Sequence, residues 1–324
     1  MMELLKEAHA NKVNTVTIGA TGTEGGTRDS KVIAGGESTL PYLFKEGQMP
    51  NEPVIAMEIL DIEPEDWPET LKRPFGDVLK DPVKWAVKCV EEYKVSILCV
   101  KLQGTHPDFG SRSADDAGKL IKDILQAVKV PLIILGSGDN EKDNVVLAKA
   151  SQVLKGERAL LGDATEKNYK TLTASCLADG HNIIAESPID INIAKQANIL
   201  ISEMGFPLER IVINPTIGAL GYGMEYAYSI MERARNAALI GDKMLAMPFV
   251  CFIGNEAWRA KEAKSTAREH PDWGDEYSRG VLWEIETACC MLQAGGDILI
   301  MRHPKAVEET RKYIAKLMGP KDKV

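Results

Sequence analysis

A chain of 324 residues that is 44% hydrophobic and 27% charged has the composition of an ordinary globular protein. Its formal net charge of −8 argues against a general nucleic-acid or anionic-membrane surface, because binding to phosphate groups depends on clustered lysine and arginine. Every apolar run is shorter than the roughly 18 residues of a membrane-spanning helix, and residues 1–12 contain no apolar signal core. We therefore expect a cytoplasmic protein that binds a small molecule or a protein partner.

Residues 1–53 predict an extension that precedes the main fold. Two β-rich stretches, 13–19 and 31–36, flank the glycine-rich loop 21–30, which is the pattern of a β-hairpin. The loop lacks the GxGxxG spacing of a phosphate-binding loop and joins strand to strand rather than strand to helix. Since residue 53 must enter a strand at its N-terminal end, we expect the hairpin to cover the bottom of a barrel formed by residues 54–324.

The region 54–324 alternates short β-rich runs with amphipathic helical stretches, which predicts successive β/α units and a parallel sheet. The runs are continuously apolar, as expected of strands that are covered on both faces. Eight consecutive units without a second domain favour closure into an α/β TIM barrel over an open doubly wound sheet. The predicted strands are 54–61, 96–102, 132–138, 159–164, 182–188, 210–216, 248–254 and 297–303.

The helices between these strands carry recognisable end signals. Asp81 followed by Pro82 predicts an N-cap with proline in the first turn, and Ser113 predicts a second N-cap. Gly205 suits the end of a helix in the left-handed conformation, and Pro304 suits the start of the final helix. Each predicted helix has one apolar face, as the outer ring of a barrel requires.

No short motif identifies a catalytic or metal centre. The six cysteines include no CxxC pair, and most of them lie in apolar runs, so we interpret them as free and buried. A hydrolytic serine would need a motif such as GxSxG, which is absent from the sequence. We therefore predict no catalytic residue and turn to the loops where barrels place their ligand sites.

Barrel proteins bind ligands with the loops that follow the C-terminal ends of their strands. Two histidines in these loops, His106 and His303, fit a role as ligand or base, and equally a role in capping or loop packing. Asp163 and Glu186 fit an acid–base pair if their pKa values diverge, although such carboxylates also orient loops. The candidate cofactor-binding residues are Gln103, Thr105, Ser137, Asp163, Glu186, Asn214, Thr216, Gly218, Gly221, Asn255, Arg302 and His303.

Two of these loops stand out by composition. The loop NPTIGALGYG contains Gly218, Gly221 and Gly223, which would let backbone amides approach a flat or bulky ligand, or would simply form a tight turn. The connection 254–280 is long and charged and contains Trp258 and Trp273. Because long loops in compact barrels are usually lids or contact surfaces, we expect these tryptophans to anchor a protein interface rather than only to pack the loop.

Long segments of the sequence resemble the small subunit of the corrinoid iron–sulfur protein of the Wood–Ljungdahl pathway, also called the delta subunit of the acetyl-CoA decarbonylase/synthase complex. The resemblance runs from about residue 13 to the C-terminus. The segments that carry it are GGTRDSKVIAGGE (25–37), DVLKDPVKWAVKCV (77–90), SPIDINIAKQANILI (187–201), INPTIGALGYGMEYAYSIMERAR (213–235), GDKMLAMPFV (241–250), NEAWRAKEA (255–263) and LIMRHP (299–304).

The resemblance implies a barrel subunit paired with a larger subunit, which holds the iron–sulfur cluster and a corrinoid-binding domain. It implies a cobalamin, shared between the two chains over the barrel's mouth, that accepts a methyl group from methyltetrahydrofolate with the help of a methyltetrahydrofolate:corrinoid methyltransferase. Acetyl-CoA synthase then receives the methyl group, so the chain is expected to be a methyl-carrier subunit without catalytic residues of its own.

The D-x-H-x-x-G motif, which supplies a histidine ligand to cobalt in other corrinoid proteins, is incomplete here. Asp179 and His181 begin it, but Ile184 replaces the glycine. This departure fits a corrinoid that receives no histidine from this chain, and it also fits a chain that binds no corrinoid.

Two other functions remain open. A free-standing barrel methyltransferase would bind a pterin directly, and Asp61, Asp163 and Asn214 are suitable ligands for it. A purely structural scaffold would hold the larger subunit without touching the cofactor.

Overall fold

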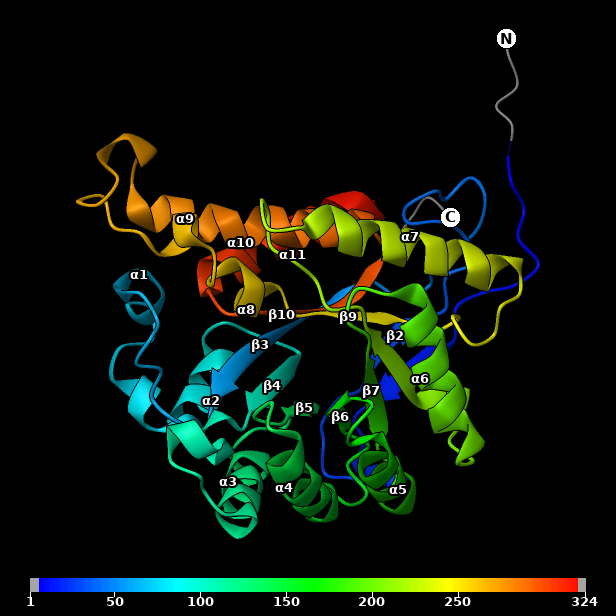
Figure 1. The fold of residues 1–324 in the computed structure, drawn as a ribbon, viewed down its shortest axis with the longest axis horizontal. Helices are drawn as coiled ribbons and strands as arrows, with labels where there is room; N and C mark the ends of the chain where they lie inside the picture. Colours follow the sequence, from blue (N-terminus) through cyan, green and yellow to red (C-terminus); the bar gives the residue numbers. More distant parts are fainter. Residues whose placement is uncertain (1–5, 320–324) are drawn as a thin grey trace.

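The computed structural model describes residues 6–319, so the outermost parts of the predicted regions 1–53 and 54–324 lie outside the described residues. Eight parallel strands close into a barrel in the order β10-β3-β4-β5-β6-β7-β8-β9, which confirms the predicted TIM barrel (Figure 1). The strands are β3 (Val54–Leu60), β4 (Ile97–Lys101), β5 (Leu132–Leu135), β6 (Leu160–Ala164), β7 (Asn182–Glu186), β8 (Ile211–Asn214), β9 (Phe249–Cys251) and β10 (Gly296–Met301).

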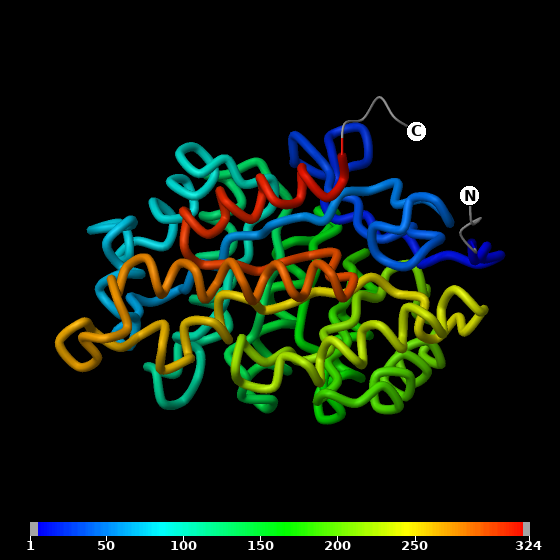
Figure 2. Tube along the Cα trace, turned by 90° about the horizontal axis from the view of Figure 1, so that it is seen from above, coloured from blue at the N-terminus to red at the C-terminus, as the bar shows by residue number. Residues whose placement is uncertain are grey.

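Eight long helices surround the barrel: α2 (Pro82–Glu91), α3 (Ala114–Ala127), α4 (Asn140–Val153), α5 (Tyr169–Asp179), α6 (Ile191–Glu203), α7 (Met224–Ile240), α10 (Glu276–Gln293) and α11 (Pro304–Met318). Three short helices, α1 (Glu69–Lys72), α8 (Ile253–Ala257) and α9 (Lys261–Lys264), belong to connecting loops. Figure 2 shows α7, α10 and α11 side by side across one face of the molecule.

The predicted end signals act as expected. The Asp81 carboxylate accepts hydrogen bonds from the backbone amides of Val83 and Lys84 at the start of α2. The Ser113 hydroxyl accepts one from a backbone amide at the start of α3, and Gly205 follows α6 with φ +81°. Most of the predicted strands extend past the observed C-terminal ends, by the most at residues 136–138, which follow β5, and at residues 252–254, of which 253–254 already belong to α8.

A separate antiparallel hairpin, β1 (Thr15–Ile18) and β2 (Val32–Gly35), lies against the N-terminal ends of the barrel strands. The Asn182 side-chain amide at the start of β7 donates to the carbonyl oxygen of Thr17 at 2.8 Å, and Gly19 donates to the carbonyl oxygen of Arg158, just before β6, at 2.8 Å. Apolar hairpin side chains join the inward-facing barrel residues in one core cluster. The hairpin therefore plugs this end of the barrel.

Buried ion pairs connect the extension to this end of the barrel. The Arg235 guanidinium lies 3.3 Å from Glu37, just after β2, and 3.0 Å from Asp297 in β10. Burial raises the pKa of Glu37 to about 8, and Asp297 adds to the rise as a neighbouring carboxyl. Arg28 and Glu157 form a second buried pair at 2.9 Å.

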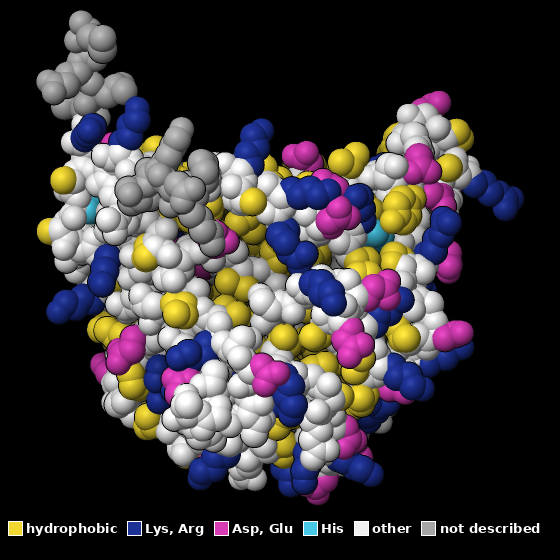
Figure 3. Space-filling model, turned by 180° about the vertical axis from the view of Figure 1, so that it is seen from behind, with side chains coloured by type: hydrophobic (Ala, Val, Ile, Leu, Met, Phe, Trp, Pro, Cys, Tyr) yellow, Lys and Arg dark blue, Asp and Glu magenta, His cyan; other side chains and the backbone are white. Residues whose placement is uncertain are grey.

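The six cysteines are free thiols, and four of them are buried, as predicted. In the part of the chain that the structure describes, no helix has both the length and the apolar composition needed to cross a bilayer. Figure 3 shows lysine, arginine, aspartate and glutamate side chains interspersed over the back of the molecule.

Candidate functional site

The mouth of the barrel carries a layer of polar side chains above the apolar interior. Residues two apart on a strand face the same side, so the inward-facing residues Ala56, Cys99 and Ile184 are each followed by an inward-facing charge. These and their neighbours on β8 and β10 form the mouth layer: Glu58, Lys101, Glu186, Asn214 and Arg302. Asp163 joins them where the β6–β7 pairing becomes irregular.

In one half of the mouth layer, the charged side chains have hydrogen-bond and ion-pair partners within the chain. The Arg302 side chain forms a short ion pair with Glu58 through Nε and donates from Nη2 to Asn255 Oδ1 at 3.1 Å. Its guanidinium carbon also lies 5.0 Å from the centre of the Trp67 ring, which is buried in the loop after β3. Arg302 and Asn255, two predicted site residues, are therefore brought together and tied to Glu58.

The other half of the mouth layer has carboxyl groups without a paired cation. Asn214 Nδ2 donates to Asp163 Oδ1 at 3.4 Å, while Asn214 Oδ1 accepts from the Thr216 amide at 3.0 Å. Burial raises the pKa of Asp163 well above its usual range, and the neighbouring Glu186 carboxyl raises it further. Burial also raises the pKa of Glu186, whose side chain has no hydrogen-bond or ion-pair partner among residues 6–319.

Lys101 lies close enough to Asp163 to oppose this rise, without forming an ion pair with it. A carboxyl group whose pKa is raised keeps its proton to a higher pH than usual, and a protonated carboxyl can donate a hydrogen bond as well as accept one. The arrangement is suited to a ligand edge that presents both hydrogen-bond donors and acceptors.

Two hydroxyl groups in the loops after β7 and β8 also lack partners. The oxygens of Ser187, after β7, and Thr216, after β8, are buried and accept or donate no hydrogen bond within residues 6–319. Asp61, after β3, binds the Gly104 amide through Oδ1 at 2.6 Å, while its buried Oδ2 has no hydrogen-bond partner and lies 3.7 Å from Arg112. Because a buried polar group without a partner is costly, an ordered water or a ligand would be stabilised at these atoms.

Three other predicted residues serve their own loops. Gln103 and Thr105 lie in a single 3₁₀ turn after β4, where the Thr105 hydroxyl donates to the Leu102 carbonyl oxygen at 2.8 Å. The Ser137 hydroxyl donates to Asp143 at 3.0 Å, and this carboxylate also accepts from the backbone amides of Ser137 and Gly138. The side chains of Thr105 and Ser137 therefore stabilise the loops that follow β4 and β5.

The glycine loop after β8 is tightly folded against α10. A Cβ atom on Gly218 would lie 2.3 Å from the carbonyl oxygen of Tyr222, and Gly221 has φ +77°. The Trp283 indole in α10 donates to the Leu220 carbonyl oxygen at 3.1 Å. The loop thus follows the tight-turn interpretation and projects toward α10, beside the mouth.

The two rim histidines act as caps. His303 is buried, accepts the Lys305 amide at Nδ1 over 3.0 Å, and stacks on Trp258 with 5.9 Å between ring centres. Burial lowers the pKa of His303 to about 4, so its ring is neutral at pH 7. His106 caps the 3₁₀ turn Pro107–Phe109 by accepting the Asp108 amide at 3.1 Å. Both rings therefore have local structural roles.

The two tryptophans of the long loop differ. Trp258 is 2% exposed and donates from Nε1 to Glu284 at 2.7 Å, which is a packing role. Trp273 is 37% exposed and stacks on His270 with 3.8 Å between ring centres. Only Trp273 remains available as an interface anchor.

Sequence analysis did not identify Glu58, Lys101 or Glu284. The first two are single charged residues inside otherwise apolar strand segments, which is a signal that could have been used. Glu284 is fully buried in α10 and accepts the backbone amides of Arg302 and His303 as well as the Trp258 indole. It fixes the end of β10 on which Arg302 stands.

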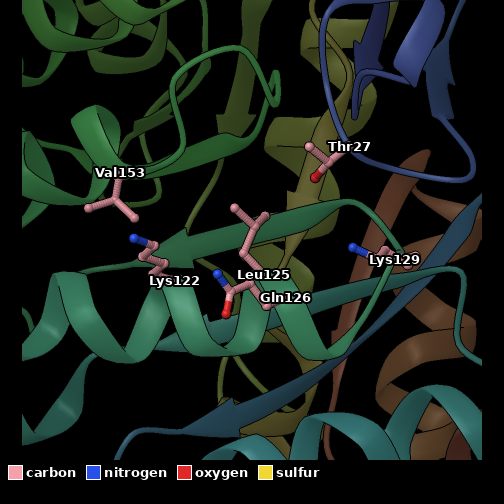
Figure 4. A pocket seen from close by; sticks show the side chains of 6 residues that line it. All are labelled: Thr27, Lys122, Leu125, Gln126, Lys129 and Val153. Atoms are coloured by element: carbon pink, nitrogen blue, oxygen red, sulfur yellow. The ribbon is translucent and has the colours of Figure 1, made fainter.

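One surface hollow lies away from the mouth. It has a volume of about 390 Å³ where the hairpin loop meets α3 and the end of α4, and Figure 4 shows three of its side chains projecting from α3. Its lining residues are Thr27, Lys122, Leu125, Gln126, Lys129 and Val153. None of the predicted site residues lines it. No group of three or more His, Cys, Asp or Glu side chains within residues 6–319 is placed to hold a metal ion.

Comparison with known proteins gives consistent matches along the chain. Residues 15–310 match the family described as CO dehydrogenase/acetyl-CoA synthase delta subunit. The chain is 40% identical over 288 residues to the acetyl-CoA decarbonylase/synthase complex subunit delta of Methanothermobacter thermautotrophicus, covering 89% of this chain and 72% of that protein. It is 37% identical over 322 residues to the corresponding subunit of Archaeoglobus fulgidus, covering 98% and 71%.

Solved structures with the same fold include dihydropteroate synthases. The enzyme of Coxiella burnetii, in complex with pteroic acid, has a TM-score of 0.56 at 12% sequence identity and covers 86% of this chain and 98% of its own. The enzyme of Xanthomonas albilineans, with 4-aminobenzoic acid, has a TM-score of 0.55 at 12% identity and covers 84% and 95%. At this identity the likeness establishes the barrel fold alone.

Proposed function

Because the chain belongs to the CO dehydrogenase/acetyl-CoA synthase delta subunit family, we propose that it is the barrel subunit of a corrinoid iron–sulfur protein that carries a methyl group on cobalamin. Its partner is a larger subunit with the corrinoid-binding domain and the iron–sulfur cluster. A methyltetrahydrofolate:corrinoid methyltransferase loads the methyl group and acetyl-CoA synthase receives it, in the cytoplasm. The barrel's mouth covers one face of the cobalamin.

The unsatisfied half of the mouth layer is the observation that carries this proposal. A corrin ring bears amide side chains around its edge, and each amide has both hydrogen-bond donors and an acceptor. The buried hydroxyls of Ser187 and Thr216 and the carboxyls of Asp163 and Glu186 offer the matching acceptors and donors. These residues therefore fit the group as partners for its periphery.

The cobalt supplies the methyl-carrying chemistry when the corrinoid is bound. The barrel contributes a cover that excludes water from one face and orients the ring through its edge. His303 is buried and its ring caps α11, so we do not assign it as a cobalt ligand.

The proposal is tested by producing the chain together with its larger subunit under anaerobic conditions and recording the visible spectrum. We expect a corrinoid spectrum in the complex that is lost when the chains are separated. A double substitution, Ser187→Ala with Thr216→Val, should lower the corrinoid retained per complex at least about fivefold. Ser229→Ala on the exposed face of α7 is the control. Full retention in the double variant would contradict a role of the mouth in holding the corrinoid.

A second candidate function is direct pterin binding at the same mouth. The observation that favours it is the hydrogen bond between Asn214 and Asp163 next to Glu186, because an amide beside a carboxyl pair can read the donor and acceptor edge of a pterin. Titration of the isolated chain with methyltetrahydrofolate, followed by calorimetry, separates the two. Tight binding that Asp163→Ala abolishes would favour a methyltransferase over a carrier.

A purely structural scaffold is the third outcome. It would form a stable complex with the larger subunit whose corrinoid content does not change when Asn214, Gly218 or Arg302 is replaced.

A further inference from the structure

An apolar groove lies outside the barrel, beside the mouth, and none of the predicted cofactor-binding residues lines it. Its volume is about 380 Å³, and its apolar walls are Leu220 from the glycine loop, Leu282 and Trp283 from α10, and Trp273 from the long loop after β9. We call this the α10 groove. It is kept open on one side by the Trp283–Leu220 hydrogen bond, which holds the glycine loop against α10.

Large apolar side chains are exposed in and around the α10 groove. Leu282 is 52% exposed and Trp273 is 37% exposed, although both are large enough to bury fully in a core. Tyr222, at the tip of the glycine loop, is 51% exposed and donates to Glu262 at 2.8 Å. Tyr226, on the first turn of α7, is 64% exposed. Exposed large apolar residues beside a hollow are typical of a protein interaction surface.

The lining of the groove carries a net negative charge, because its two carboxylates, Asp275 and Glu286, outnumber its one cation, Arg279. The Arg279 guanidinium is fixed in place by donating to the backbone carbonyl oxygens of Glu262, Ser265 and Trp273. The carboxylate of Asp275 accepts the Ser278 amide at 2.8 Å as the cap of α10, and Glu286 has no partner among the described residues. An occupant would therefore place lysine or arginine opposite these two carboxylates.

The α10 groove lies at the same end of the barrel as the mouth. The glycine loop leaves the C-terminal end of β8, and α10 begins at this end because each outer helix runs antiparallel to the strands. Figures 1 and 2 show the projecting loop at the end of α10 that is far from the N-terminal hairpin. A partner that covers the mouth thus has the groove at its edge.

We propose that the α10 groove docks a segment of the larger, corrinoid-bearing subunit, which inserts an apolar side chain between Leu282 and Trp273 and places basic residues opposite Asp275 and Glu286. This inference rests on the proposed function for the identity of the partner. The groove acts as an anchor outside the cofactor site, so it holds the two chains together independently of the corrinoid.

The test compares Leu282→Asp and Glu286→Lys with Ile240→Asp. Ile240 is 79% exposed at the opposite end of α7, so it controls for adding a charge at an exposed apolar residue. The Kd for the larger subunit is measured by sedimentation with both chains purified, and circular dichroism checks folding. We expect Leu282→Asp and Glu286→Lys each to raise the Kd at least about tenfold, and Ile240→Asp to leave it unchanged.

An unchanged Kd in both groove variants would overturn the inference. The inference would also be overturned if the isolated chain forms a homodimer that Leu282→Asp disrupts, while the binding of the larger subunit is not weakened. The corrinoid spectrum keeps the two proposals apart. A colourless complex whose Kd still rises in Leu282→Asp contradicts the carrier function alone. A coloured complex whose Kd is unchanged by Leu282→Asp contradicts the groove proposal alone.

Discussion

The two ends of the barrel differ in how they hold neighbouring buried carboxyl groups. At the hairpin end, Arg235 lies between Glu37 and Asp297, and Asp297 also accepts the Phe249 amide at 2.7 Å. At the mouth, Asp163 and Glu186 share a raised pKa with no cation paired to either. At the hairpin end a cation lies between the two carboxyl groups, while Asp163 and Glu186 at the mouth have no paired cation among the described residues.

The largest effect is expected from Arg235→Met at the hairpin end. Removing the fully buried cation leaves two carboxyls without their partner, and breaking such a buried pair costs about 3–5 kcal/mol. The free energy of unfolding from urea titration measures the loss. Arg233→Met, on the exposed face of the same helix, should change it by less than about 0.5 kcal/mol. Equal losses in the two variants would remove the distinction between the ends.

Gly218→Ala should have the next largest effect, at the mouth. The new Cβ would lie 2.3 Å from the Tyr222 carbonyl oxygen, so the loop must shift, at a cost of about 1–3 kcal/mol. Corrinoid retention in the complex should fall together with the unfolding midpoint. Gly22→Ala in the hairpin region is the matched control, because a Cβ there meets no atom within 4 Å. A midpoint equal to that of the control would show that the tight turn is dispensable.

Glu37→Gln should change how stability depends on pH. The pKa of Glu37 is raised from 4.5 to about 8 in the folded chain, so the stability that its proton provides is complete below pH 4.5 and is lost as pH rises through 8. The wild-type slope from this group is at most about 1.4 kcal/mol per pH unit between these values. Glutamine cannot ionise, so thermal unfolding of the variant between pH 5 and 8.5 should show a shallower decline. If the stability of the variant declines with pH as steeply as that of the wild type, other groups cause the decline.

The smallest effect is expected from Glu186→Gln. Burial raises the pKa of Glu186, so ionising this group costs stability as the pH rises, and an uncharged amide should remove that cost. We expect a small gain in the free energy of unfolding at pH 8, measured against the exposed control Glu166→Gln. A loss of stability would mean that Glu186 is a structural group, as Glu37 is.

Much of the barrel was predictable because its strands are apolar on both faces and are separated by helices with clear caps. The same uniformity hides which residues face inward, so Glu58 and Lys101 were missed although they stand in the mouth layer. The sequence also predicted residues 136–138 as part of a strand, because it does not show that the Asp143 carboxylate accepts hydrogen bonds from the backbone amides of Ser137 and Gly138.

The sequence brought the polar residues at the strand ends together but did not separate them by role. The rule that barrel sites follow strand ends put Asp163, Glu186 and Asn214 into one list, and the structure places them on adjacent strands. It gave no means to separate them from His303, which turns away into aromatic packing with Trp258 and Tyr277. Side-chain direction at a strand end depends on tertiary contacts such as those of Glu284, which lies about 20 residues earlier in the chain.

The hairpin closes the N-terminal end of the barrel, so the mouth layer can be reached from the opposite end only. Val16, Ile18, Val32 and Ala34 fill that end together with the inward-facing strand residues. Any ion, solvent molecule or ligand that reaches the mouth layer must therefore enter and leave by the same side. A partner bound over the mouth would therefore close the route to the mouth layer. Its movement away from the mouth would control the access of solvent and other molecules to a ligand bound there.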